Sequence, residues 1–298
     1  MTPDESLTLE ARGENTLAVM FRAMASPCEV LLPLMSKEGA VGLASLAARE
    51  AWRIEKKYSR YRTDSVTAWI HRHTGAKVVL DDETTSLMNF AKQCFDLSEG
   101  LFDITSGVLR RAWTFDGSDR VPETARIREL LPLIGFEKIQ WQAPCLVLPS
   151  GMELDFGGIG KEYAVDRAYD LLSAVSSIPF LINFGGDLRA NRPPPHGSWQ
   201  VAIERPDTEH EASMLLNLEH GALATSGDSR RYLLKEGTRY GHILNPLTGW
   251  PDPEAPRSIT VAASSCTEAG LLSTLAMLRG AGARAYLDEQ GVRYWLLE

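Results

Sequence analysis

The stretch from Leu154 to Arg167 constrains the fold of this chain more than any other. An apolar run ends at Asp155-Phe156, glycines follow at positions 157, 158 and 160, and Lys161 stands where a helical pattern begins. Glycines let a backbone pass close to a ligand, a helix start presents free N–H groups to an anion, and a lysine adds a compact positive charge. The stretch therefore predicts a phosphate-binding turn between an extended segment and a helix.

Composition limits the class of protein. The chain has 298 residues, of which 44% are hydrophobic and 23% charged, which is typical of a globular protein with one large domain or two lobes that share a core. Its formal net charge of −8 makes nucleic acid a poor partner. The four cysteines stand far apart without a CxxC pair, so we expect reduced thiols rather than a zinc site or a disulfide framework.

The N-terminal segment is polar and acidic. Residues 1–16 predict a flexible tail, ahead of a domain that spans residues 17–298. The tail lacks the basic and apolar regions of a signal peptide, so we expect the chain as given to be cytoplasmic, and periplasmic if a leader has been trimmed. No run of about 18 apolar residues occurs, so we expect no transmembrane segment.

Hydrophobic periodicity predicts an α+β fold with mixed or antiparallel sheets flanked by helices. Helices are expected at 41–59, 61–73, 82–98, 108–115, 122–131, 162–174 and 267–278. Strands are expected at 17–21, 28–32, 77–80, 139–148, 152–156, 180–183, 199–203, 214–218, 222–225, 231–234, 242–245, 258–263 and 292–297.

Three glycine-containing turns carry an acid or a hydroxyl, and each follows a strand-like run. They are Asp155–Lys161, Asn183–Asp187 and Thr225–Asp228. Any one of them alone is more often a plain tight turn, but three in one half of the chain favour a ligand pocket built of backbone amides. Neither GxxxxGK[ST] nor GxGxxG occurs, so a P-loop and a Rossmann dinucleotide site are excluded.

His242 precedes an Asn-Pro turn and a Thr-Gly corner. A lone histidine of this kind is either a hydrogen-bonded structural residue or a general base, since a neutral imidazole near pH 7 can accept a proton from a hydroxyl. The sequence leaves both interpretations open.

The loop Phe102–Gly107 holds one acid between aromatic and hydroxyl residues. Asp103 either caps a helix or accepts a hydrogen bond from an exocyclic amine, as on adenine. Tyr61 and Met24 are candidates for the walls of a site for a flat ring system.

The order of these motifs resembles that of the ApbE family, the FAD:protein FMN transferases. The resemblance covers residues 18 to 298, and each piece is weak by itself, whereas eight in the same order are a strong signal. The pieces are Met24–Ser26, Ser59–Tyr61, Phe102–Thr105, Gly157–Glu162, Asn183–Asp187, Thr225–Asp228, His242–Gly249 and Gly270–Thr274.

The resemblance implies an ApbE-like, two-lobed single domain that moves FMN from FAD to a threonine hydroxyl of an acceptor flavoprotein, with release of AMP. It implies FAD as substrate, Mg²⁺ as metal, and His242 as the catalytic base. The FAD-binding residues that it implies are Met24, Tyr61, Phe102, Asp103, Gly158, Ile159, Gly160, Lys161, Gly185, Gly186, Asp187, Ser226, Gly227 and His242. The metal site that it implies comprises Gly160, Thr274 and the helix position of Gly270.

The chain departs from the family pattern at that metal site. The family has an aspartate one helical turn before the threonine, and this chain has Gly270 there, so Glu162 or Glu268 must replace the missing carboxylate if the site is kept. Gly160 stands for an alanine, Glu162 for a glycine, and Asn245 for an acid. We therefore retain two alternatives, a metal-dependent FAD hydrolase and an FAD-binding protein without catalysis. The alignment also predicts that Gly270→Asp strengthens the dependence on magnesium.

Overall fold

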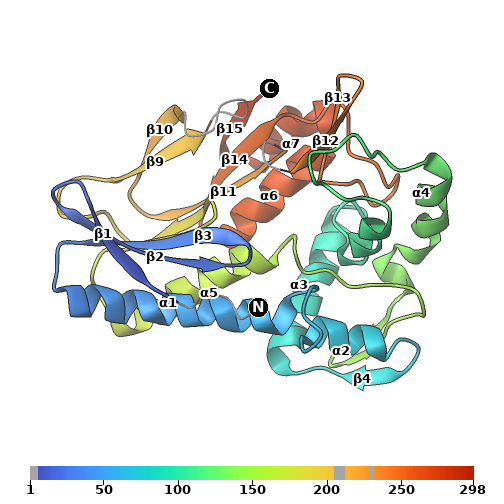
Figure 1. Ribbon diagram of the computed structural model, residues 1–298, viewed down its shortest axis with the longest axis horizontal. Coiled ribbons are helices and arrows are strands. Elements are labelled where there is room, and N and C mark those ends of the chain that lie inside the picture. The colour runs from blue at the N-terminus through green and yellow to red at the C-terminus, as the bar shows by residue number, and fades with distance from the viewer. Residues whose placement is uncertain (1–5, 205–211, 229–230) are drawn as a thin grey trace.

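The computed structural model describes residues 6–204, 212–228 and 231–298, and its centre is an eight-stranded antiparallel sheet (Figure 1). The strand order is β1-β2-β3-β7-β8-β11-β14-β15. The bounds are β1 (Thr8–Arg12), β2 (Thr16–Ala23), β3 (Ser26–Pro33), β7 (Leu181–Phe184), β8 (Asp187–Ala190), β11 (Gly221–Gly227), β14 (Ser258–Ala263) and β15 (Arg293–Leu297).

Helices cover this sheet. α1 (Lys37–Tyr58) packs on β2 and β3, α5 (Gly160–Val175) packs on β7 and β8 and against α1, and α6 (Cys266–Leu278) packs on β11 and β14 (Figure 1). α1 begins where Ser36 accepts a hydrogen bond from the backbone N–H of Gly39, and its buried face is a stripe of alanines that allows close packing. α7 (Ala283–Gln290) follows α6.

Asp166 joins α5 to the start of α6. Its carboxylate accepts hydrogen bonds from the backbone N–H groups of Cys266 and Thr267, at 2.9 Å each, and from the hydroxyl of Thr267 at 2.6 Å. The guanidinium of Arg189 lies 2.7 Å from the same carboxylate. Because the first N–H groups of a helix have no partner within the helix, this carboxylate both caps α6 and fixes it against α5.

A second lobe is inserted between β3 and β7. It contains α2 (Val66–Arg72), α3 (Asp82–Leu97), α4 (Thr124–Leu130), a 3₁₀ helix over Ile104–Arg111 and the small sheet β4-β6-β5. The strands of that sheet are β4 (Lys77–Val79), β5 (Gln140–Gln142) and β6 (Cys145–Val147). The described chain also has two antiparallel strand pairs, β9 (Trp199–Glu204) with β10 (Ala212–Leu218), and β12 (Tyr232–Lys235) with β13 (Thr238–Gly241). Short 3₁₀ helices lie at Leu131–Leu133, Phe136–Lys138 and Gly280–Gly282. Within the described ranges, none of the helices has the length and apolar character needed to cross a bilayer.

The α+β class with antiparallel sheets and helices is confirmed, but several segments differ from the sequence prediction. Residues 6–16 are not a loose tail, since β1 pairs along β2. Residues 152–156 form no strand: the alternation of Met152, Leu154 and Phe156 reflects burial on one side. The backbone N–H of Leu154 donates to His71 instead of to a neighbouring strand.

Further segments also differ from the prediction. The single strand expected at 139–148 is two antiparallel strands, β5 and β6, and β8 and β13 were not predicted. Residues 242–245 lie beyond the end of β13 and are irregular, and α7 was not predicted. Residues 108–111 end a 3₁₀ helix that starts at Ile104, so the helix expected at 108–115 begins and ends earlier.

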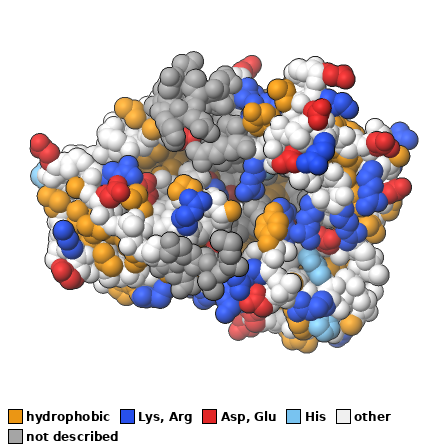
Figure 2. All heavy atoms as spheres, in the orientation of Figure 1, with side chains coloured by type: hydrophobic (Ala, Val, Ile, Leu, Met, Phe, Trp, Pro, Cys, Tyr) orange, Lys and Arg blue, Asp and Glu red, His pale blue; other side chains and the backbone are white. Residues whose placement is uncertain are grey.

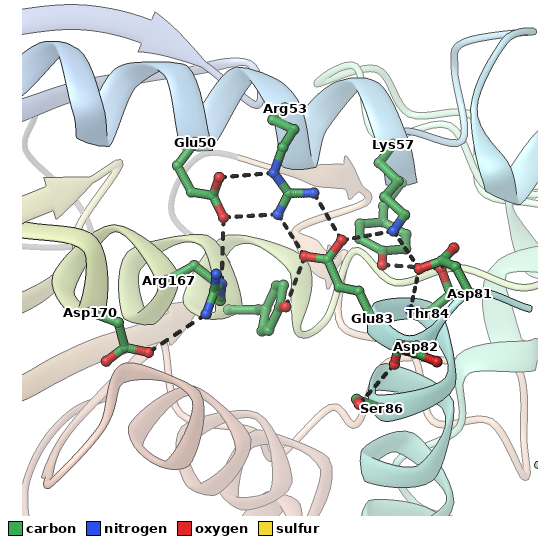
Figure 3. Close-up of polar contacts among 12 residues, drawn as sticks. Glu50, Arg53, Lys57, Asp81, Asp82, Glu83, Thr84, Ser86, Arg167 and Asp170 are labelled. Carbon is green, nitrogen blue, oxygen red and sulfur yellow. Dashed lines mark hydrogen bonds and ion pairs between the residues drawn. The ribbon is translucent and has the colours of Figure 1, made fainter. Parts of the chain in front are cut away.

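A charged network holds α1, α3 and α5 together (Figure 3). The guanidinium of Arg53 lies 2.8 Å from Glu50 and 2.6 Å from Glu83, and Lys57 lies 2.7 Å from Glu83. The hydroxyl of Tyr163 on α5 also donates to Glu83, at 2.9 Å. Hydrogen bonds from Arg53, opposed by burial and aided by Lys57, lower the pKa of Glu83 to about 2. This carboxylate therefore links all three helices while it is ionised.

We expect Glu83→Gln to lower the free energy of unfolding at pH 7 by on the order of 2 kcal/mol, because hydrogen bonds to a charged group are lost. Since the pKa of Glu83 is lower in the folded than in the unfolded chain, its contribution is complete above about pH 4.5 and is lost as the pH falls towards 2. Urea unfolding at pH 6 and near pH 3 measures this, with Glu289→Gln, at an exposed position of α7, as control. A difference from wild type that is the same at both pH values would contradict this role.

Candidate active site

Two hairpin turns meet at one end of the sheet. Gly185-Gly186 connects β7 to β8, and Met24-Ala25 connects β2 to β3. Because β3 pairs with β7, the turns are adjacent: the N–H of Gly185 donates to the carbonyl of Pro27 at 2.9 Å. Met24 and Ala25 have φ values of 52° and 58°, which only glycine adopts without cost, and such strain is typically kept at functional sites.

Lys161, in the first turn of α5, faces these turns. Its ammonium lies 2.8 Å from Oδ2 of Asp187 and donates to the carbonyl of Gly185 at 3.3 Å. Burial, the largest single influence, would lower the pKa of Lys161, but the charges of Asp187 and Glu162 and the hydrogen bond to Asp187 together raise that pKa. Asp187 is 2% exposed, and its Oδ1 accepts from the N–H of Thr225 on β11 at 3.3 Å. The predicted binding residues of two motifs therefore form one buried ion pair.

Hydroxyls from β11 and α6 lie beside this pair. The Oγ of Ser226 lies 2.8 Å from the Oγ of Ser273 and 3.0 Å from the Oγ1 of Thr274. The hydroxyl of Ser273 donates to the carbonyl of Gly270 at 3.0 Å. The structure thus brings together Ser226, Thr274 and Gly270, as the motif order implies.

Glu162 occupies the space beside Gly270. A Cβ added at Gly270 would lie 2.5 Å from the Cγ of Glu162 and 2.8 Å from its Oε1. The Oε2 of Glu162 is buried and has no hydrogen-bond partner among the described residues. Burial, and next the charge of Asp187, raise the pKa of Glu162 above its ordinary range.

Glu268, the other acid considered for this position, points elsewhere. Its carboxylate accepts from the backbone N–H of Ser264 at 3.2 Å and from the hydroxyl of Ser264 at 2.7 Å, and the residue is exposed. Glu268 therefore caps the N-terminus of α6 through Ser264 and does not reach Gly270.

The glycine turn before α5 packs on core side chains on one side and borders open space on the other. The ring of Phe102 lies 3.3 Å from the position of a Cβ on Gly158, and Ile159 is buried in the core. Nothing lies within 4 Å of a Cβ position at Gly160, nor at Gly186 in the facing turn. This open space lies beside the N-terminus of α5 and the Lys161 ammonium, both of which favour a phosphate-bearing ligand.

His242 lies at the edge of this group. Its Nδ1 donates to the carbonyl of Arg231 at 3.2 Å, so the lone pair of the neutral ring is on Nε2. Burial, then the charge of Arg231, lower the pKa of His242 to about 4, and the charges of Asp228 and Lys161 also act on it. The ring is therefore neutral at pH 7, as a general base must be.

Two other residues of the predicted FAD site, Asp103 and Gly227, make structural contacts. Asp103 caps the 3₁₀ helix, accepting from the N–H of Thr105 at 2.8 Å and of Phe136 at 3.1 Å. Asp103 also borders a cavity of about 360 Å³ with Gly135 and Pro246. Gly227 permits close strand pairing, because a Cβ there would lie 2.7 Å from the carbonyl oxygen of Arg257.

Tyr61 and Asp155 lie beside the glycine turn. Tyr61 is 77% exposed, and its hydroxyl accepts from Arg60 at 2.8 Å. Arg60 also pairs with Asp155, whose other oxygen accepts from the N–H of Gly157 at 2.9 Å. The sequence reasoning did not single out Arg60 as a site residue, although it stands between two motif residues, Ser59 and Tyr61.

The surface around these elements carries both signs of charge. Figure 2 shows Lys and Arg side chains with acidic ones among them on the face displayed. In the part of the chain that the structure describes, no group of three or more His, Cys, Asp and Glu side chains is placed to hold a metal ion. The oxygen atoms gathered near Gly270 still fit a hard cation, because the Oε2 of Glu162 is unpartnered and the hydroxyls of Thr274 and Ser226 are close.

Comparison with known proteins matches this arrangement to one family. The sequence profile of the ApbE family matches residues 24–296. The chain belongs to the ApbE family. It is similar to the FAD:protein FMN transferase of Vibrio cholerae, with 30% identity over 236 residues, which is 76% of this chain and 70% of that protein. It is also 30% identical to an FAD:protein FMN transferase of Klebsiella pneumoniae over 85% of this chain and 79% of that protein.

A crystal structure shows the same fold. The ApbE protein from Thermotoga maritima superposes with a TM-score of 0.84 at 30% identity, over 94% of this chain and 93% of that one. The ApbE fold is therefore shared, while the packing of Glu162 beside Gly270 is a feature of this chain's own structure.

The structure changes the expectation for Gly270→Asp. An aspartate Cβ would collide with the Cγ of Glu162, and its charge would face a second buried carboxylate. We expect Gly270→Asp to be destabilised by about 1–3 kcal/mol, by chemical unfolding, while Gly282→Asp, at a glycine with no Cβ contact closer than 3.9 Å, is close to neutral. Equal stability of Gly270→Asp and wild type would show that Glu162 does not fill this space.

Proposed function

We propose that this protein transfers the FMN part of FAD to a threonine hydroxyl of an acceptor protein, with release of AMP and with help from a divalent cation, Mg²⁺. Membership of the ApbE family and the relatives named above make it an FAD:protein FMN transferase, with FAD and a protein as its two substrates. The threonine, the cation and the roles of individual residues are our proposals.

One observation carries the proposal: the turns that face Lys161 and the start of α5 are open. The space beside Gly160 and Gly186 adjoins the Lys161 ammonium and the positive end of α5, while the N–H groups of Gly160 and Gly186 themselves donate to Phe156 and Asn183. A pyrophosphate placed there meets an ammonium that Asp187 already holds in position, and phosphoryl transfer depends mainly on such positioning and charge neutralisation.

The reaction breaks one bond and forms another at the FMN phosphorus. The threonine oxygen attacks that phosphorus, the bond from phosphorus to the bridging oxygen breaks, and the bridging oxygen leaves on AMP. Lys161 is held by Asp187, so its ammonium stays at one place opposite the developing negative charge. A divalent cation bound by Glu162, Thr274 and the Gly160 carbonyl would neutralise phosphate charge.

His242 takes the proton of the attacking hydroxyl in this proposal. Its Nδ1–H is fixed on the carbonyl of Arg231, which leaves Nε2 as the acceptor. With a pKa of about 4 the ring is unprotonated throughout the neutral range, so Nε2 keeps its lone pair.

The test of the function is a direct assay of products. The protein is incubated with FAD, Mg²⁺ and a flavoprotein acceptor, and AMP is quantified while the acceptor is examined by mass spectrometry. We expect AMP and an equal amount of acceptor carrying FMN, and no FMN on an acceptor whose target threonine is valine. AMP with free FMN only would indicate the hydrolase, and bound FAD without AMP would indicate a binding protein, so either result contradicts transfer.

For His242→Ala we expect FAD binding within about twofold of wild type and a loss of transfer of about 10²–10⁴-fold, the usual contribution of a general base. Transfer should be measured from pH 5 to 8. Because the pKa of His242 lies below this range, we expect no rise in wild-type activity from deprotonation of the ring. His196→Ala is the matched control, since His196 lies in an exposed loop. Wild-type turnover in His242→Ala would remove this residue from the mechanism.

A further inference from the structure

The carboxylate of Glu162 lies where a side chain at position 270 would lie. The distance of 2.5 Å between its Cγ and a Cβ built on Gly270 means that the two positions cannot both carry a side chain without movement. Glu162 belongs to the first turn of α5 and Gly270 to the second turn of α6, so two different helices can deliver a side chain to one space.

Glu162 also adds a second buried carboxyl group beside Lys161. Lys161 pairs with Asp187 at 2.8 Å, and a single ammonium then faces two carboxylates. The buried Oε2 of Glu162 has no hydrogen-bond partner among the described residues. A buried carboxylate oxygen left without a partner is costly, and it is kept where it meets a ligand.

We propose that Glu162 is the metal-binding carboxylate of this enzyme, delivered from α5 in place of a carboxylate from α6. The inference rests on the proposed function for the pyrophosphate that shares the cation. Magnesium is commonly held by one or two carboxylates together with substrate phosphates rather than by an all-protein cage. One carboxylate, the Thr274 hydroxyl and the phosphates therefore form an adequate set, even though no three acidic, His or Cys groups cluster in the described chain.

If Glu162 binds the cation, replacing it should change the coupling between Mg²⁺ and FAD, by which we mean the factor by which Mg²⁺ tightens FAD binding. The dissociation constant of FAD is measured by flavin fluorescence without acceptor, in EDTA and in excess Mg²⁺, and AMP is assayed afterwards to correct for cleaved FAD. For wild type we expect Mg²⁺ to tighten FAD binding by at least about tenfold, the scale on which groups that support a metal act.

Glu162→Gln keeps the shape of the side chain and removes its charge. We expect FAD to bind this variant in EDTA as tightly as wild type or more tightly, because a negative charge near the pyrophosphate is gone, while the effect of Mg²⁺ falls to less than about twofold. A purely structural role would weaken FAD binding equally in EDTA and in Mg²⁺. Glu268→Gln, which alters the carboxylate held by Ser264, should keep the wild-type coupling.

The double variant Glu162→Gly with Gly270→Asp moves the carboxylate from α5 to α6. Because the collision between the two side chains is removed, we expect this variant to recover both thermal stability and Mg²⁺ coupling, whereas Gly270→Asp alone does not. Its recovery would show that the two positions supply one ligand from two helices.

Two results would overturn the inference. One is wild-type coupling in Glu162→Gln, and the other is a double variant that folds with wild-type stability yet shows no coupling. Both leave the proposed transfer intact if the acceptor still gains FMN. Absence of coupling in wild type, with full transfer in EDTA, would reject this inference and the cation of the proposed function but not FMN transfer itself.

Discussion

The site depends on the carboxylate of Asp166, which fixes the start of α6 against α5. Three hydrogen bonds from the first turn of α6 and an ion pair with Arg189 on β8 converge on this one group. The contact sets the separation of the two helices, and it lies one turn along α5 from Glu162. Without this contact, the hydroxyls of α6 and Lys161 of α5 would not be held next to each other.

A series of short contacts connects the start of α5 to α6 through β8 and β11. Lys161 pairs with Asp187, Asp187 accepts from Thr225, and the neighbouring Ser226 reaches Thr274 on α6. These residues come from β8, β11, α5 and α6, so the core of the large sheet positions them before any ligand arrives. Pre-positioned groups of this kind lower the reorganisation needed for phosphoryl transfer.

Much of this arrangement could be predicted from sequence, because the glycine turns, the hydroxyl motif and the histidine motif are local signals in a recognisable order. The sequence also indicated that the metal site would be weakened unless Glu162 or Glu268 replaced the acid missing at Gly270. It could not decide between Glu162 and Glu268, since that depends on the distance between two helices that are far apart in the chain. For the same reason the sequence predicted that Gly270→Asp strengthens the dependence on magnesium, whereas in the structure the side chain of Glu162 occupies the space that the aspartate would need.

The errors in the fold have a similar cause. β1 is short, exposed and polar, so only its pairing with β2 identifies it as a strand. The alternation at Met152, Leu154 and Phe156 is that of a strand, but the backbone there bonds to His71 and Ile104 instead of to a ladder. Periodicity records which side of a segment is buried, and it does not record whether a partner strand is present.

The most direct test of this account is a crystal structure with FAD and Mn²⁺, in which anomalous scattering locates the cation. The account predicts one Mn²⁺ peak bonded to a carboxylate oxygen of Glu162 and to phosphate oxygens, with the pyrophosphate beside Gly160 and Gly186 and Lys161 still paired with Asp187. A cation bound by Glu268, or a pyrophosphate bound away from the start of α5, would contradict it.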